Sequence, residues 1–152
     1  MSDDQPIMMR DYGPPLKEPL IDWLIFARGA DNKFDRETED QLLNLYGVTN
    51  GVGVETPGVG EVKLVVYFRV VGLKPLAKYR LGVLQADAAK GIVGGSVTAE
   101  GKDAETREDG SLQTGIDVSF SGLSFGHFVL ILKIGDHNLP AILPVYAKKQ
   151  SA

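Results

Sequence analysis

The chain has 152 residues, of which 43% are hydrophobic and 24% are charged, and it contains no cysteine. This length is typical of one domain with one core, and the average charged content excludes a wholly disordered chain. The missing cysteines exclude disulfides, thiolate metal sites and a thiol nucleophile. No apolar run approaches the ~20 residues of a membrane helix, and the opening residues lack the order of a secretory signal, so we expect no membrane contact. A cytoplasmic protein, or a virion or other particle component made in the cytoplasm, is the expected class.

Charge is unevenly divided along the chain. Residues 1–61 carry twelve acidic and five basic side chains, a net charge of −7, whereas residues 62–152 carry eleven basic and eight acidic side chains, a net charge of +3. The basic side chains of the second part are scattered, and nucleic-acid binding needs a concentrated basic face. We therefore expect no nucleic-acid partner.

The first 19 residues differ in composition from the rest of the chain. They hold four prolines and two adjacent methionines, which together make a stiff tether with a short apolar anchor. We predict an extended N-terminal arm over residues 1–19 that contacts protein, either its own domain or a neighbouring subunit. The candidate interaction residues are Met8, Met9, Tyr12, Pro14 and Pro15.

Strand patterns begin after the arm. The stretch PLIDWLIFARG, residues 19–29, is rich in β-forming residues and predicts a first strand. Residues 35–47 are ambiguous, because their leucines fit either a helical stripe closed by Gly47 or one face of a strand. We favour a strand over residues 42–50, preceded by at most a helical turn. The glycine-rich stretch 51–60 is expected to be a flexible connection.

From residue 60 onward the dominant pattern is alternation, which places successive side chains on opposite faces of a strand. The alternation predicts that Phe68, Phe120, Phe128 and Leu130 point inward. Further strands are expected at residues 61–72, 77–87, about 91–98, 111–122, 127–135 and 138–147.

Two of these regions carry further expectations. The last strand contains Pro140 and Pro144, and because proline cannot donate to a ladder, this strand is expected at a sheet edge. The charged stretch between the strands near 91–98 and 111–122 is expected to be a surface loop, residues 99–110.

Short strands separated by turns, with no long helix between them, predict an all-β fold, an antiparallel β-sandwich of seven or eight strands. The segments LIDWLIFARG, QLLNLYGVTNGV, EVKLVVYFRVVG and SLQTGIDVSFSGLSFGHFVLILKIGDHNLPAILPVYA together resemble an uncharacterised bacterial family of immunoglobulin-like β-sandwich proteins. This resemblance implies an immunoglobulin-like fold and transfers no catalytic residue. The expected organisation is an arm at residues 1–19, one sandwich domain at 20–148 and a short polar tail at 149–152.

The adjacent pair Asp136-His137 invites an acid–base interpretation. Neighbours on a strand point to opposite faces, so they do not ordinarily share a proton. The composition Gly-Asp-His-Asn between two apolar runs is instead typical of a hairpin turn. His127 is expected at a solvated rim of a strand.

The other motifs in the sequence do not predict a catalytic, phosphate-binding or calcium-binding site either. The stretch GLSFG, residues 122–126, matches the letters of a nucleophile elbow but has strand-like flanks on both sides, which predicts a turn between strands. The stretch at 51–60 lacks the Gly-Lys-Ser/Thr and the helix of a phosphate loop. The acidic residues of 31–40 lack the spacing of a calcium loop, which leaves at most a weak surface cation site. We therefore expect no catalytic residue, no cofactor and no resident metal.

The sequence favours a non-catalytic structural or protein-interaction module, a subunit of a larger assembly that associates with itself or with another protein. The alternative is a sandwich that binds a small molecule or glycan through loops 51–60 and 99–110, with Tyr46 or Tyr67 stacking on the ligand. A hydrolase that uses His127 or His137 is the third hypothesis.

Overall fold

The computed structural model describes residues 14, 16–35, 40–86 and 94–148. These residues form an all-β fold without a helix, which confirms the predicted class, but they hold eleven strands where the sequence predicted seven or eight. The strands are β1 (Leu20–Ala27), β2 (Gly29–Asp35), β3 (Asp40–Tyr46), β4 (Val52–Val54), β5 (Glu61–Val71), β6 (Lys78–Gln85), β7 (Ser96–Ala99), β8 (Lys102–Glu105), β9 (Leu112–Ser121), β10 (Gly126–Ile134) and β11 (His137–Ala147).

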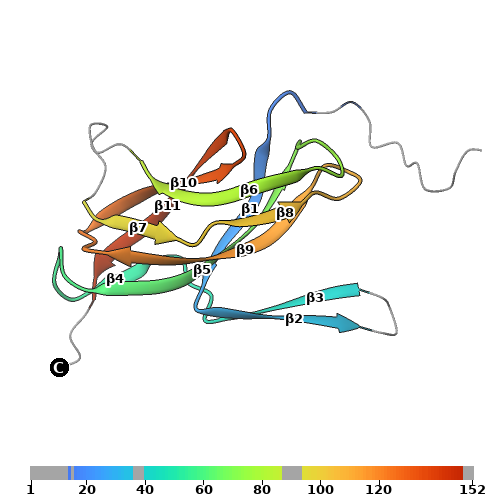
Figure 1. The fold of residues 1–152 in the computed structure, drawn as a ribbon. Coiled ribbons are helices and arrows are strands. Elements are labelled where there is room, and N and C mark those ends of the chain that lie inside the picture. The colour runs from blue at the N-terminus through green and yellow to red at the C-terminus, as the bar shows by residue number, and fades with distance from the viewer. Residues whose placement is uncertain (1–13, 15, 36–39, 87–93, 149–152) are drawn as a thin grey trace, which may run out of the picture.

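Two sheets pack face to face as a sandwich (Figure 1). One sheet has four strands in the order β1-β5-β9-β7, and the other has five in the order β4-β11-β10-β6-β8. All pairings are antiparallel except that of β4 with β11, so the prediction of a wholly antiparallel sandwich is wrong at this one pairing.

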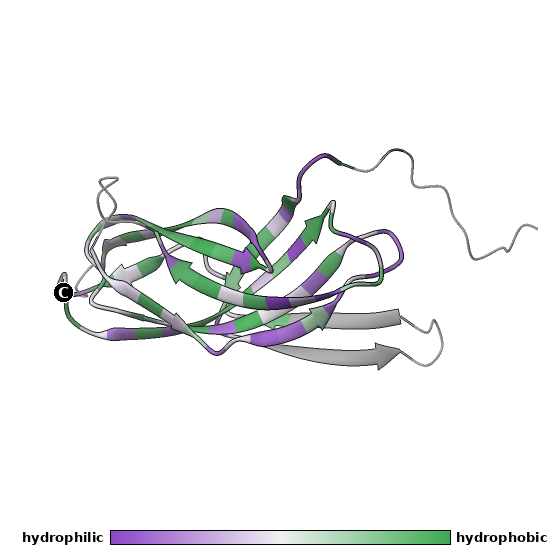
Figure 2. Cartoon of the chain, turned by 45° about the horizontal axis from the view of Figure 1, so that its top comes forward, coloured by the Kyte–Doolittle hydropathy of each residue, from purple (hydrophilic) through white to green (hydrophobic). Residues whose placement is uncertain are grey.

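The core lies between the two sheets and follows from the alternation of their longest strands. Figure 2 shows hydrophobic and hydrophilic residues alternating along these strands. Phe68, Phe120, Phe128 and Leu130 are each fully buried, as predicted. The rings of Phe120 and Phe128 meet edge to face across the sandwich, with centroids 5.6 Å apart and planes at 87°. The three phenylalanines are therefore central to the packing of one sheet on the other.

A two-stranded hairpin, β2–β3, is inserted between β1 and β4. Its register runs from Gly29 opposite Tyr46 to Asp35 opposite Asp40, and it pairs with neither large sheet. The hairpin extends from the end of β1 as a separate ribbon (Figure 1). The strand predicted at 42–50 is thus present with earlier bounds, whereas its partner at 29–35 was not predicted, because polar residues interrupt the apolar alternation there.

Two short strands lie where loops were expected. β4 falls within the stretch predicted as a flexible connection, and β8 lies within the predicted loop 99–110. Gly51, directly before β4, lets the backbone approach β11 closely: a Cβ there would stand 2.8 Å from the carbonyl oxygen of Pro144. β8 has the sequence KDAE and pairs with β6 at the sheet edge. Tertiary pairing, which local sequence does not report, stabilises both strands.

The proline-bearing strand β11 is not an edge strand over its whole length. β4 pairs with Val145–Ala147, so that end of β11 lies inside the sheet and the edge prediction is wrong there. Residues 137–144, which include both prolines, pair with β10 alone. The prolines therefore occupy the part of β11 that has a free edge, as their missing N–H donors require.

Candidate functional site

The outward side of the five-stranded sheet is apolar. Cross-strand partners share a face, and Ile131 lies opposite both Leu84 and Pro140, while Val129 lies opposite Ile142. Leu84 and Ile142 are 49% and 56% exposed. We call this surface the β11 face, and it consists of Leu84, Val129, Ile131, Pro140, Ile142 and Pro144.

The outward side of the four-stranded sheet is mixed. Beside β1 it is apolar, with Ile25 opposite Tyr67 and Leu20 opposite Val71. Over β5 and β9 it is polar. Lys63 lies opposite Ser119 there, and Arg69 lies opposite Gln113. Antiparallel sheets with one solvated face ordinarily show this polar pattern. The five-stranded sheet, by contrast, has apolar side chains facing outward across three neighbouring strands, β6, β10 and β11.

An apolar groove of about 590 Å³ runs along the seam between β1 and β11. The inner side chains Ile21, Leu24 and Phe26 form its floor on the β1 side, and the edge of β11 forms the other wall. Its remaining lining residues are Ile25, Val48, Thr49, Asn50, His127, Pro140, Ala141, Ile142 and Pro144. The groove shares Pro140, Ile142 and Pro144 with the β11 face, so the two surfaces are continuous.

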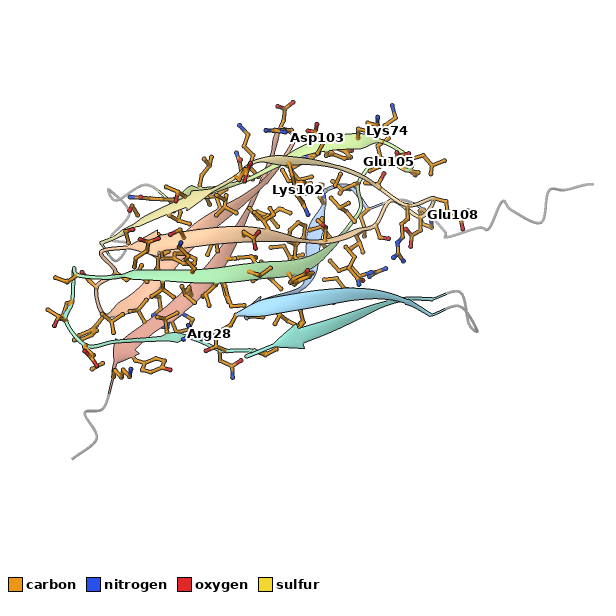
Figure 3. All side chains as sticks on the ribbon, turned by 60° about the horizontal axis from the view of Figure 1, so that its bottom comes forward. Arg28, Lys74, Lys102, Asp103, Glu105 and Glu108 are labelled. Carbon is orange, nitrogen blue, oxygen red and sulfur yellow. The ribbon has the colours of Figure 1, made fainter. Side chains whose placement is uncertain are left out.

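The edge strands β8 and β1 differ in charge. The edge strand β8 carries Lys102, Asp103 and Glu105, which lie along one side of the molecule with Lys74 and Glu108 (Figure 3). Charges at an edge discourage pairing with a further strand. The edge strand β1 has only one charged residue, Asp22, which pairs with Arg69 on the adjacent strand. A regular edge is thus left between Trp23 and Ala27.

The two histidines do not form a catalytic site. Gly135 and Asp136 make the two-residue turn between β10 and β11, with Gly135 at φ +58°, so the turn predicted here is confirmed. His137 is exposed, and its ring centroid lies 6.5 Å from that of Tyr79. His127 is exposed at the rim of the groove, as predicted, opposite Pro144 at the far end of the same hairpin. Seven residues of β10 separate the two ends, a distance of about 23 Å at 3.3 Å per residue.

The remaining motifs have structural roles. The stretch 122–126 connects β9 to β10, which confirms the predicted strand-to-strand turn in place of a nucleophile elbow. Within the described residues no group of three or more His, Asp or Glu side chains stands close enough to hold a metal ion. Of the acidic cluster at 31–40, residues 36–39 lie outside the described residues, as do the side chains of the others.

The loops named for ligand binding line smaller or more polar hollows. Loop 51–60 lines a groove of about 290 Å³ together with Leu123. A second groove, of about 510 Å³, lies on the polar outer sheet face, where Arg28 and Lys63 stand with Glu100 and Asp117. The ring of Tyr67 lies against Gly115, where an added Cβ would stand 2.6 Å from the ring. Tyr67 thus uses one ring face for packing, and the side chain of Tyr46 lies outside the described residues.

The turn before β9 contains Asp109, a carboxylate whose pKa is shifted in the folded protein. Both the backbone N–H and the hydroxyl of Ser111 donate to Asp109 Oδ1, at 2.9 and 2.6 Å. The hydroxyl bond lowers the pKa of Asp109 below its ordinary value; partial burial opposes this, and the backbone bond and the Arg69 guanidinium, 3.9 Å away, support it. This carboxylate closes the turn before β9.

The predicted interaction residues of the arm are mostly outside the described residues. Met8, Met9, Tyr12 and Pro15 belong to that set, and Pro14 is exposed. The groove and the β11 face were not predicted. One signal was available for the face: the run FVLILKI in β10 is apolar at nearly every position, which is typical of a strand covered on both sides.

The fold and these surfaces define a two-sheet β-sandwich with one apolar outer face and an inserted hairpin. The chain matches no protein-family model, no curated protein and no solved structure. No helix that could cross a membrane occurs in the part of the chain that the structure describes.

Proposed function

We propose that this protein is a non-catalytic, immunoglobulin-like structural subunit that assembles with further copies of itself through the β11 face. The observation that carries the proposal is the set of apolar side chains that runs across β6, β10 and β11 and continues into the groove. Burial of exposed residues such as Leu84 and Ile142 contributes roughly 25 cal/mol per Å² removed from water. A protein contact is the simplest way to remove that surface from solvent.

The strand order supports the immunoglobulin-like part of the proposal. The order β1-β5-β9-β7 corresponds to strands A-B-E-D of a constant-type domain, and β11-β10-β6 corresponds to G-F-C. Three features depart from that pattern: the β2–β3 hairpin follows the first strand, β4 joins the second sheet beside β11, and β8 joins the second sheet after β7. These additions leave the central correspondence of seven strands intact.

A second copy is the proposed partner because the β11 face suits self-pairing. Closed dimers bring the same patch of both subunits together, so a patch must tolerate its own charges. Within the described residues, this face has charge only at its border, at Lys133 and at Arg80, which pairs with Asp103 at 3.3 Å. Two copies therefore meet across apolar side chains without like charges at the centre.

The size of the face sets the expected strength of the contact. Three strands about 4.8 Å apart, with nine residues at about 3.3 Å each, project to roughly 400 Å². Standard protein interfaces bury about 800 Å² per partner. The face alone is thus expected to give weak association, and a stable assembly needs a further contact.

Sedimentation velocity over a range of concentrations tests the proposal. We expect the full-length chain to associate, and Leu84→Lys to raise the dissociation constant at least tenfold by placing a charge in the face. The matched control is Val59→Lys, because Val59 is 65% exposed on the β4–β5 loop and outside the face. A monomeric wild type at high micromolar concentration, or equal weakening by both substitutions, would contradict self-assembly through this face.

Small-molecule or glycan binding is a second candidate, favoured by the groove of about 510 Å³ on the polar face. Its volume lies within the range of about 300–1,000 Å³ that is typical of ligand sites. Its lining offers charges of both signs and the hydroxyls of Thr98 and Ser119, which suit a polar ligand. Native mass spectrometry of protein purified from its host would detect a retained ligand, and Asp117→Ala should then release it.

A further inference from the structure

The groove between β1 and β11 has an unpaired strand edge on one side only. β1 pairs with β5, and at its other edge the described residues show a single bridge, in which Thr49 N–H donates to the Phe26 carbonyl at 2.9 Å. Across the groove, the free part of β11 contains Pro140 and Pro144, which have no N–H to donate. A strand that entered the groove would therefore pair with β1.

β1 is also the edge least protected against such pairing. The edge strands β4 and β7 have three and four residues, and β8 is charged. β1 has eight residues, with a register shift between Ile21 and Trp23. Bulges and charges discourage strand addition, and Phe26 is already bridged to Thr49, so the free edge runs from Trp23 to Ile25, beside the apolar groove.

The sequence offers one segment of suitable length and character. Within the arm, Ile7–Tyr12 (IMMRDY) lies between Pro6 and Pro14 and contains no proline, so every residue has an N–H donor. Six extended residues span about 20 Å, which is more than enough to cover the free edge of three residues on β1. Ile7, Met8 and Met9 supply apolar side chains for an apolar groove.

The start of the described chain indicates that the segment comes from another copy. Leu16 lies over Gly72, where an added Cβ would stand 3.1 Å from the Leu16 Cβ. Gly72 follows the end of β5, and β5 pairs with the side of β1 opposite to the groove. The chain thus approaches β1 from the β5 side, away from its own groove.

We propose that the groove between β1 and β11 receives the arm segment Ile7–Tyr12 of a neighbouring copy, which adds as a strand to the free edge of β1. This inference rests on the self-association proposed above, and it supplies the further contact that the small β11 face requires. Backbone hydrogen bonds to β1 provide the affinity. The side chain of Met8 or Met9 enters the groove and thereby sets the register of the arm segment on β1.

The absence of cysteine permits a direct crosslinking test in trans. One full-length variant carries Met9→Cys and a second carries Val48→Cys, at a groove residue that is 56% exposed and outside the β11 face. After the two variants are mixed, a short bismaleimide should give a heterodimer much faster than for the control pair, Met9→Cys with Val59→Cys. Equal yields for both pairs would overturn the proposal.

Two further measurements separate the possible failures. Met8→Asp with Met9→Asp in the full chain should raise the dissociation constant of self-association at least tenfold, and a labelled peptide of residues 5–13 should bind this variant. Peptide binding should be lost with an added Val48→Asp and kept with an added Leu84→Lys. Association that survives Met8→Asp with Met9→Asp would refute the arm contact while leaving the β11 face intact. A monomeric wild type would refute the self-association itself, and a fast crosslink within one chain carrying both cysteines would show that the arm binds its own groove.

Discussion

At the scale of single residues, a close approach between two backbone segments constrains the chain at Gly110. Gly110 has φ +78°, and a Cβ there would overlap the carbonyl oxygen of Leu73. The same loop is held by Leu73 N–H, which donates to the Gly110 carbonyl at 3.1 Å, and by Gly110 N–H, which donates to the Arg107 carbonyl at 3.0 Å. The turn before β9 is therefore built around a position that admits no side chain.

Gly110→Ala should accordingly reduce stability by about 3 kcal/mol or more, because backbone strain and steric overlap add together. Gly58→Ala is the matched control, since Gly58 also has φ +78° but has no neighbour within 4 Å of an added Cβ. That control should cost about 1–2 kcal/mol, the penalty of the left-handed conformation alone. Urea denaturation of both variants gives the difference, and equal losses would show that the Leu73 contact relaxes without cost.

Asp109 in the same turn predicts a pH dependence of stability. Its pKa is lowered in the folded state chiefly by the Ser111 hydroxyl, so its stabilising effect is complete above the unfolded-state pKa of about 3.9 and is lost as the pH falls through the lower folded value. Asp109→Asn should therefore cost about 1 kcal/mol from pH 5 to pH 8, and wild type should lose this advantage below about pH 4.

Denaturant titrations of wild type and Asp109→Asn across this pH range measure the effect. Asp103→Asn serves as control, because it removes only an exposed ion pair with Arg80 and should change stability by less than about 0.5 kcal/mol. An advantage of wild type that stays constant down to pH 2 would contradict the role assigned to the Ser111 hydrogen bonds.

At the scale of elements, one aromatic contact joins the two sheets. Phe120 of β9 and Phe128 of β10 are both fully buried, and each Phe→Ala substitution should cost about 3–5 kcal/mol. Their edge-to-face geometry should add a coupling energy of about 0.5–1.5 kcal/mol in a double-mutant cycle. Phe68 with Phe128 gives the comparison cycle, since the ring of Phe68 makes no such contact in the described structure. A coupling energy in the Phe120–Phe128 cycle that is no larger than in the Phe68–Phe128 cycle would contradict this contribution of the ring geometry.

Prediction from the sequence worked best for the long strands. β5, β9 and β10 each bury alternate residues in the core, so apolar residues recur at every second position of their sequences. It failed for β2, β4 and β8, which are polar or rich in glycine. In addition, β4 and β8 pair with strands that are far away in the chain. The groove was beyond prediction for the same reason, because its walls come from residues 21–26, 48–50, 127 and 140–144.

At the scale of the whole molecule, the sandwich has different surfaces on its two sides. The outer face of the four-stranded sheet is polar over β5 and β9, and the β8 edge is charged, whereas the seam at β1 and β11 is apolar together with the adjoining β11 face. Natural β proteins usually protect every edge and every large apolar face. The concentration of apolar surface around this seam is consistent with the proposed association through it.

The parallel pairing of β4 with β11 has a consequence for synthesis of the protein. Val52 pairs with Val145, so β4 is synthesised early but cannot pair until β11 is synthesised, about 90 residues later. The five-stranded sheet cannot close until residue 147 has left the ribosome, and at roughly 5–20 residues per second this delay lasts between several seconds and about twenty seconds. During this time the apolar inner faces of β5 and β9 lack part of the sheet that covers them. Nascent chains of this protein are therefore expected to bind chaperones until β11 emerges, and slower translation across residues 126–147 should increase that binding.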